Sequence, residues 1–218
     1  MALSKLNYNS LNLTPVAGKG IGFDSGADDL EASFTGKSMV FIKKLTASSD
    51  STLTFLNGGS DVVFDSTYKE YFFILTNTHP SANPGIISFQ ATTDGTNYNT
   101  TVTSTYFRSY NNEADNSAAL QYATGFDLAQ STSVINLDSG SGSGNHEASS
   151  GLLRIFNPSS TTFVKHFMGQ VLDENDGDFS HNVFTAGYFN TTSAITGVRF
   201  SMDSGNIDAG TITLYGIN

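Results

Sequence analysis

Two dense apolar runs on either side of a polar turn dominate the pattern of this chain. Leu152 to Phe156 and Phe163 to Met168 flank the polar residues 157–162, which include Pro158. Proline cannot donate a backbone hydrogen bond and biases the preceding residue away from the α region, so we expect a turn here. Apolar runs around a turn predict two antiparallel strands. Neither run alternates cleanly with polar residues, which predicts central strands covered on both faces, by a second sheet or by a neighbouring subunit.

Similar runs recur along the rest of the chain. Continuous apolar runs predict buried strands at 39–42 and 71–75, whereas alternation at 52–55 and 198–202 predicts strands with one buried face. Further strands are expected at 86–91, 100–107, 183–189 and 211–215, with turn signals such as Asp94-Gly95 between them. About ten strands without a long helix predict an all-β fold, a jelly-roll-like antiparallel β-sandwich with an extended N-terminal arm.

The pattern also predicts which residues form the core and which segments form loops. We expect one helical turn within 113–120, a flexible loop tip at 139–144 and an exposed acidic hairpin turn at 173–178. The residues expected to line the interior are Leu153, Ile155, Phe163, Phe167, Val198, Phe200, Met202, Ile212 and Leu214.

The first 37 residues differ from the remainder, which gives an expected division into an arm at 1–37 and a sandwich domain at 38–218. Glycines between 18 and 26 disfavour a helix or a long strand. A frayed terminus is the alternative to a docking arm, but a purely disordered tail would not need spaced apolar residues. The residues expected to attach the arm are Leu3, Leu6, Leu11, Leu13, Ile21 and Phe23.

The charge balance argues against several partners. The chain carries 10 Lys and Arg against 20 Asp and Glu, a formal net charge of −10. Nucleic acids and anionic membranes attract basic surfaces, so we expect neither as a partner. No apolar run is long enough for a membrane span, and Met1 to Lys5 lacks the apolar core of a signal peptide. We therefore expect synthesis in a cytoplasm.

The sequence contains no recognisable catalytic or cofactor motif, so we expect no cofactor and no enzyme activity. There is no cysteine, and the four histidines do not share a metal-ligand spacing. The acidic run 173–178 resembles a calcium loop, but Gly177 and Phe184 stand where oxygen ligands would be needed, which favours a solvated turn. The glycine-rich segments match neither a dinucleotide fingerprint nor a phosphate loop.

Several tyrosines offer possible platforms for a sugar. Aromatic rings stack on sugar rings, but the chain has no Trp. The alternative is that these rings lie on half-buried strand faces or at a subunit contact. The candidates for glycan contact are Tyr68, Tyr98, Tyr106, Tyr110 and Tyr122.

Three stretches resemble a group of small bacteriophage virion proteins of marine tailed phages. These stretches are 153–167, 185–195 and 204–217, and the opening residues 1–11 are similar too. The resemblance implies a virion structural role in a tail fibre, a head fibre or a capsid decoration, with other virion proteins as partners. It supplies no catalytic residues. We expect a fibre-type surface appendage fixed by the arm, with a decoration protein and a receptor-recognising carbohydrate-binding module as alternatives.

The apolar runs also predict self-association. Strands that are apolar on both sides carry more apolar surface than one sandwich interior needs, and a leftover apolar face marks a contact surface. Rings that close avoid runaway filaments. We therefore expect a homotrimer, with a monomer as the alternative and with the acidic turn 173–178 outside the contact.

Overall fold

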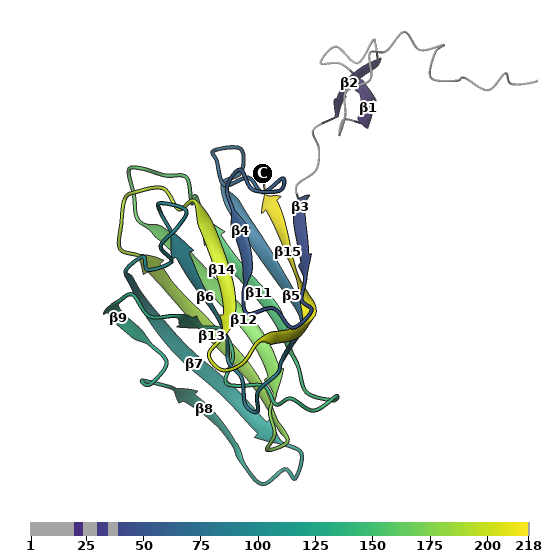
Figure 1. Ribbon diagram of the computed structural model, residues 1–218, viewed down its shortest axis with the longest axis vertical. Helices are drawn as coiled ribbons and strands as arrows, with labels where there is room; N and C mark the ends of the chain where they lie inside the picture. Colours follow the sequence, from purple (N-terminus) through teal and green to yellow (C-terminus); the bar gives the residue numbers. More distant parts are fainter. Residues whose placement is uncertain (1–19, 24–29, 35–38, 218) are drawn as a thin grey trace, which may run out of the picture. The chain divides into compact units, whose positions relative to one another are not determined.

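The computed structural model describes residues 20–23, 30–34 and 39–217 (Figure 1). The chain divides into two compact units, Met1–Ser38 and Met39–Asn218. In the first unit, β1 (Gly20–Phe23) and β2 (Leu30–Phe34) pair antiparallel in a sheet of their own. Ile21 and Phe23 belong to β1. The other residues expected to attach the arm, Leu3, Leu6, Leu11 and Leu13, lie outside the described residues.

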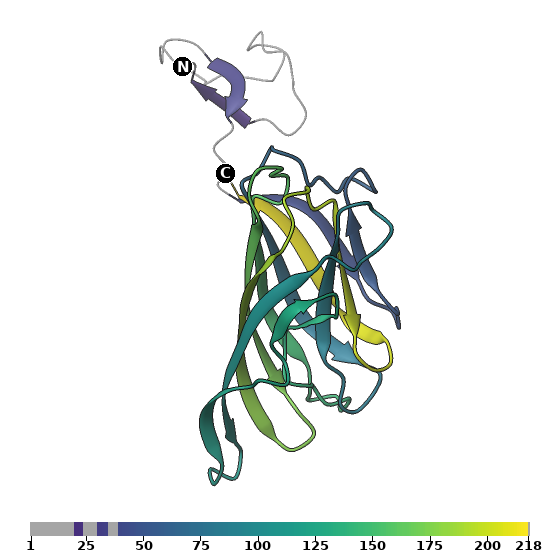
Figure 2. The same ribbon diagram turned by 90° about the vertical axis from the view of Figure 1, so that its left-hand side faces the viewer.

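The second unit is an antiparallel β-sandwich of two unequal sheets (Figures 1 and 2). The smaller sheet has four strands in the order β10-β6-β14-β4, and the larger has nine in the order β3-β15-β5-β11-β12-β13-β7-β8, with β9 also paired to β7. The strands are β3 (Met39–Thr46), β4 (Leu53–Leu56), β5 (Glu70–Pro80), β6 (Ile87–Thr92), β7 (Val102–Asn112), β8 (Ala118–Tyr122), β9 (Leu128–Ser131), β10 (Ile135–Asn136), β11 (Ser149–Phe156), β12 (Lys165–Glu174), β13 (Phe179–Phe189), β14 (Gly197–Met202) and β15 (Ile207–Ile217).

The chain passes repeatedly from one sheet to the other. The strands β4, β6, β10 and β14 lie in the small sheet, and each is followed by a strand of the large sheet. This alternation gives the sandwich its jelly-roll-like character. The described residues form no helix, and so none that could span a membrane.

The two apolar runs around Pro158 form neighbouring central strands, as the sequence predicts. Strands β11 and β12 pair antiparallel, with Ile155 opposite Phe167. Their side chains alternate: Leu153, Ile155 and Phe167 are buried, whereas Met168 is 43% exposed. The small sheet covers one face of the large one, so within this unit no second sheet covers the other face, and its cover by a neighbouring subunit stays a prediction.

Aromatic side chains join the two sheets in the core. Phe73 of the large sheet packs edge-on against Phe55 and Phe200 of the small sheet, with ring centroids 5.3 Å apart in both pairs. Phe167 meets Phe89 at the same distance. Such edge-to-face pairs add to the stabilisation from buried area. Eight of the nine predicted interior residues are buried: Leu153, Ile155, Phe167, Val198, Phe200, Met202, Ile212 and Leu214.

The ninth, Phe163, is 70% exposed, which corrects the prediction. Strand β12 begins only at Lys165, and Phe163 lies in the preceding turn, where its backbone N–H donates to Ser160 Oγ at 3.2 Å. The inward position is filled by Lys165, whose Nζ donates to the carbonyl oxygens of Ser160, Phe163 and Thr191. A buried ammonium with three acceptors is satisfied without a counter-ion.

Two further expectations about local structure are wrong. Residues 39–42 form a strand as expected, but an edge strand: among the described residues β3 pairs only with β15, and Phe41 is 59% exposed. Residues 113–120 form no helical turn: β7 continues to Asn112, and its partner β8 begins at Ala118. Pairing with β7 supplies the backbone hydrogen bonds that a helix would otherwise supply. The Asp94-Gly95 turn is confirmed, with Asp94 Oδ1 accepting from the N–H groups of Thr96 and Asn97.

The burial of Phe200 yields a stability prediction. Phe200→Ala removes a fully buried ring and leaves a cavity, so it should lower the free energy of unfolding by about 3–5 kcal/mol. Phe163→Ala is the matched control and should change it by less than about 0.5 kcal/mol. Urea denaturation followed by circular dichroism measures both values. Equal losses in the two variants would contradict the assignment of Phe200 to the core.

Candidate functional site

The broadest candidate surface is the outer face of the large sheet, the side turned away from the small sheet. Residues directly opposite each other on neighbouring strands project from the same face, so the strand register identifies its members. One row across the sheet is Phe41, Tyr215, Phe72, Arg154, Met168, Ala186 and Thr105. The next row is Lys44, Thr213, Ile74, Leu152, Gln170, Phe184, Phe107 and Tyr122.

This outer face is apolar over much of its width. Leu120 is 77% exposed and Leu172 50% exposed, and both belong to a third row that also contains Asn182 and Ser109. Phe107 and Phe184 stack with ring centroids 4.9 Å apart. Exposed apolar patches of this extent on a folded domain mark contact surfaces.

Few charges interrupt the outer face. In the two long rows the charged side chains are Lys44 and Arg154, and Arg154 forms an ion pair with Glu70. The Arg154 guanidinium also lies 5.9 Å from the ring centre of Phe72 and 5.4 Å from that of Phe156. The acidic residues that give the chain its net charge of −10 are therefore largely absent from these rows.

A buried polar network lies at the segment expected to be a flexible loop tip, which corrects that expectation. Asp138 and Ser141 are fully buried, as is Ser149 of β11. Asp138 Oδ1 accepts hydrogen bonds from the backbone N–H groups of Ile87, at 3.0 Å, and Gly140. Its Oδ2 accepts from the hydroxyl groups of Ser141, at 3.1 Å, and Ser149. The network fixes the loop after β10 to β6 and β11.

The protonation of Asp138 follows from its surroundings. Burial raises the pKa of its carboxyl group to about 8, and the nearby Asp173 carboxylate acts in the same direction. Hydrogen bonds from Ser149, Ser141 and Gly140 lower the pKa in part. The group is thereby held mainly neutral at pH 7, and a protonated carboxyl can itself donate a hydrogen bond within the network.

A second buried pair adjoins this network. Asp173 and His181 face each other across β12 and β13, and His181 Nδ1 lies 2.7 Å from Asp173 Oδ1. The other carboxylate oxygen, Asp173 Oδ2, accepts from the backbone N–H of Ser139 at 2.9 Å. Asp173 is 4% exposed, so the expectation of an exposed acidic turn at 173–178 holds for its tip and fails at Asp173.

The five candidate tyrosines are not gathered into one platform. Tyr106 is fully buried, which rules it out as a glycan contact: its hydroxyl donates to the carbonyl oxygen of Asp138, and its ring stacks on Phe126. Tyr98 lies beneath the Arg199 guanidinium, 4.4 Å from the ring centre. Tyr122 is half exposed on the outer face.

The remaining two tyrosines lie far apart in the strand order. Tyr68 precedes β5 and packs edge-on against Tyr71 of the core. Tyr110 lies in β7, directly opposite His181. Of the five tyrosines, Tyr110 is thus the one that lies beside both a histidine, His181, and an arginine, Arg108.

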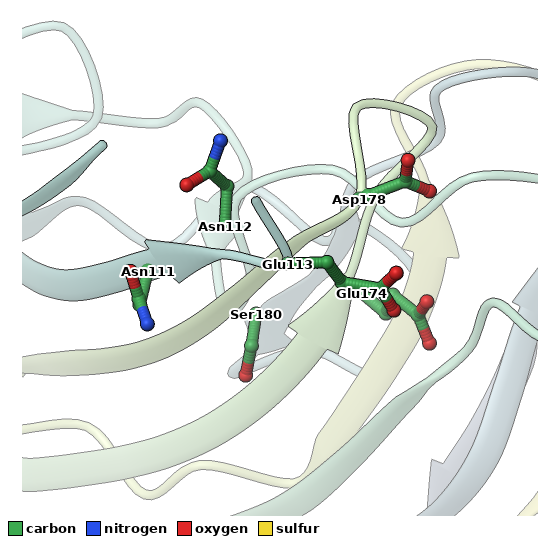
Figure 3. Close-up of a pocket in the computed structure, with 6 residues that line it drawn as sticks. All are labelled: Asn111, Asn112, Glu113, Glu174, Asp178 and Ser180. Carbon is green, nitrogen blue, oxygen red and sulfur yellow. The ribbon is translucent and has the colours of Figure 1, made fainter. Parts of the chain in front are cut away.

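An acidic hollow lies near the β12–β13 turn. It is lined by Asn111, Asn112, Glu113, Glu174, Asp178 and Ser180 (Figure 3). In that view the carboxylate of Asp178 lies apart from those of Glu113 and Glu174. Within the part of the chain that the structure describes, no group of three or more His, Asp or Glu is placed to hold a metal ion.

The functional features that sequence reasoning missed are Asp138 and the Asp173–His181 pair. Asp138 precedes a Ser-Gly repeat, a composition that is typical of flexible segments and so conceals a buried network. The histidine and its carboxylate partner are eight residues apart, and only the hairpin brings them together.

No protein-family model, curated protein or solved structure matches this chain.

The neutral Asp138 carboxyl predicts a pH-dependent stability. Its pKa is higher in the folded state than the value near 4 of an unfolded chain, so the folded state binds the extra proton, and stability falls as the pH rises between about 4 and 8. The wild-type chain should lose about 2 kcal/mol of unfolding free energy from pH 5 to pH 7 through this group.

Asp138→Asn should remove that loss, because an amide keeps the shape and the acceptor oxygen but does not titrate. Urea denaturation of both chains at the two pH values measures the difference. An equal pH slope in wild type and variant would show that Asp138 ionises normally in the folded protein.

Proposed function

We propose that this chain is a non-enzymatic structural protein of a bacteriophage virion, a fibre-type appendage at the particle surface, anchored through residues 1–37. The observation that carries the proposal is the apolar outer face of the large sheet, which this unit leaves uncovered within the described residues. A protein with such a face is expected to function within an assembly. The stretches that resemble phage virion proteins include all of β15 and parts of β11, β12 and β13, which contribute to both the core and the outer face.

The dimensions and charge of the outer face support contact with further copies of the chain. Strands about 4.8 Å apart and about 10 residues long give eight neighbouring strands a footprint of roughly 1,000 Å². A stable interface buries about 800 Å² on each partner. Copies that each carry a net charge of −10 repel one another least where acidic groups are scarce. We propose a homotrimer, in which rotational closure limits the assembly.

A capsid decoration protein is the second candidate. In this role the same outer face would pack against a shell subunit of different sequence. The chain would then be a monomer before it binds the shell. The oligomeric state in solution and the position on the particle distinguish the two roles.

The proposed trimer predicts a mass near three times the 23.2 kDa of one chain in light scattering at micromolar concentration. Leu172→Glu places a carboxylate on the outer face, where the directly opposite residues Ser150 and Asn182 are neutral, and should shift the mass to that of one chain, since a buried unpaired charge is costly. Ser204→Glu, in the exposed turn between β14 and β15, is the matched control and should leave the trimer intact.

A monomeric wild-type chain would contradict the trimer and favour the decoration role. Loss of the trimer in both variants would show that added charge alone, and not the outer face, governs association.

The anchoring role of the N-terminal residues is tested by truncation. A chain that begins at Gly36 keeps the complete sandwich and should unfold with an unchanged midpoint, but it should no longer attach to particles. Electron microscopy of virions labelled with an antibody against the sandwich shows both attachment and position. Label at the tail or a vertex supports the fibre, and label over the shell supports decoration. An insoluble truncated chain would place the removed residues in the core and contradict their role as an arm.

A further inference from the structure

A small cleft lies on the inner side of the large sheet, where β7 ends and β13 begins. These strand ends lie at the lower end of the sandwich in Figure 1. Here a second hydrophobic cluster replaces the main core: Tyr106, Ala123 and Val183, with Phe126 packed against them. The cleft has a volume of about 250 Å³ and is lined by Arg108, Tyr110, Ser117, Asn175, Phe179 and His181. Its size suits a ligand smaller than the drug-sized molecules that fill pockets of 300 Å³ or more.

His181 presents one ring nitrogen to this cleft. The side chain is 95% buried, and its Nδ1 is engaged by Asp173. Nε2 has no hydrogen-bond partner among the described residues. Every buried side-chain nitrogen or oxygen atom of those residues does have a partner, so Nε2 is not fully buried. Nε2 is therefore the polar atom that reaches solvent, and it does so in the cleft that His181 lines. The Asp173 carboxylate accepts a hydrogen bond from Nδ1–H and fixes the ring, so Nε2 is left to form a hydrogen bond with a ligand in the cleft.

Arg108 supplies a cationic group to the cleft. It lies beside Tyr110 and Phe126, with the guanidinium carbon 5.7 Å and 6.0 Å from the ring centres. Only Gln121, at 3.3 Å from both Nε and Nη2, accepts from it among the described residues. The remaining guanidinium donors are free for a carboxylate, which arginine binds with two parallel hydrogen bonds.

The other lining residues match a ring that carries hydroxyl groups. Phe179 lies parallel to His181, with ring centroids 6.0 Å apart, and Tyr110 meets both rings edge-on. Ser117 and Asn175 add neutral hydrogen-bonding groups, and none of the six lining residues is acidic. The acidic hollow of Glu113, Glu174 and Asp178 lies near the same hairpin, which disfavours ligands of high negative charge.

We propose that this cleft binds a single acidic sugar unit, with its carboxylate on Arg108, a hydroxyl group on His181 Nε2 and its ring against Tyr110 and Phe179. A singly charged carboxylate pairs with the Arg108 guanidinium, whereas the aromatic rings and the neutral polar groups contact the sugar ring. The inference does not depend on the assembly role proposed above, since the cleft and the outer face lie on opposite sides of the sheet. A monomeric chain can carry the site equally well.

Isothermal titration calorimetry of the full chain tests the site with glucuronate, glucose, acetate and inorganic phosphate as probes. Glucuronate should bind about tenfold or more tightly than glucose, because charge-assisted hydrogen bonds to the carboxylate are then available. It should also bind more tightly than acetate and phosphate, which lack the ring. Arg108→Gln should weaken glucuronate binding by about tenfold.

Arg199→Gln is the matched control, since Arg199 also donates to a glutamine and lies over a tyrosine ring, but outside the cleft. It should bind glucuronate as the wild type does. Tyr110→Ala is a second variant that tests ring contact even if Arg108→Gln fails to fold. No measurable glucuronate binding, equal binding of glucose, equal or tighter binding of acetate or phosphate, or equal losses in the Arg108 and Arg199 variants would each overturn the proposal.

Discussion

The structure depends on one geometric imbalance: the sheet of four strands covers one face of the sheet of nine strands and leaves the other face without a cover in this unit. The small sheet buries the inner side chains of the large one through interlocked aromatic pairs such as Phe73 with Phe200. A sheet hides the side chains of only one face against one partner. This unit leaves apolar residues of the other face exposed, among them Phe41 at one edge of the sheet and Leu120 at the opposite edge. The proposed assembly role follows from this exposed apolar face.

A polar centre inside the sandwich constrains how its parts fit together. Asp138, Ser141 and Ser149 are fully buried, and their hydrogen bonds connect the loop after β10 with β6 and β11. Asp173 extends this centre to Ser139 and to His181. Buried polar groups are costly unless every one has a partner, so the network permits one arrangement of these segments. The hydrogen bond between Asp173 and His181 also fixes the orientation of the His181 ring at the cleft.

Much of the sandwich could be predicted from local patterns. Alternation at 52–55 and 198–202 identified the inward residues Leu53, Phe55, Val198, Phe200 and Met202, because the side-chain period of a strand equals two whatever its partners. The pattern failed where burial depends on a neighbour. Phe163 is apolar but lies in a turn, and Lys165 is charged but lies inside, with three carbonyl oxygens supplied by two different loops.

The sequence by itself determined the all-β class, the central hairpin, most of the core and the acidic, sparsely charged surface. These follow from composition and from periodicities that act over a few residues. Tertiary structure alone decided which face of the large sheet is covered, that Tyr106 is buried while Tyr110 lines a cleft, and that Asp173 meets His181. Such features arise from strand order and register between distant segments, and no local pattern encodes which strands become neighbours.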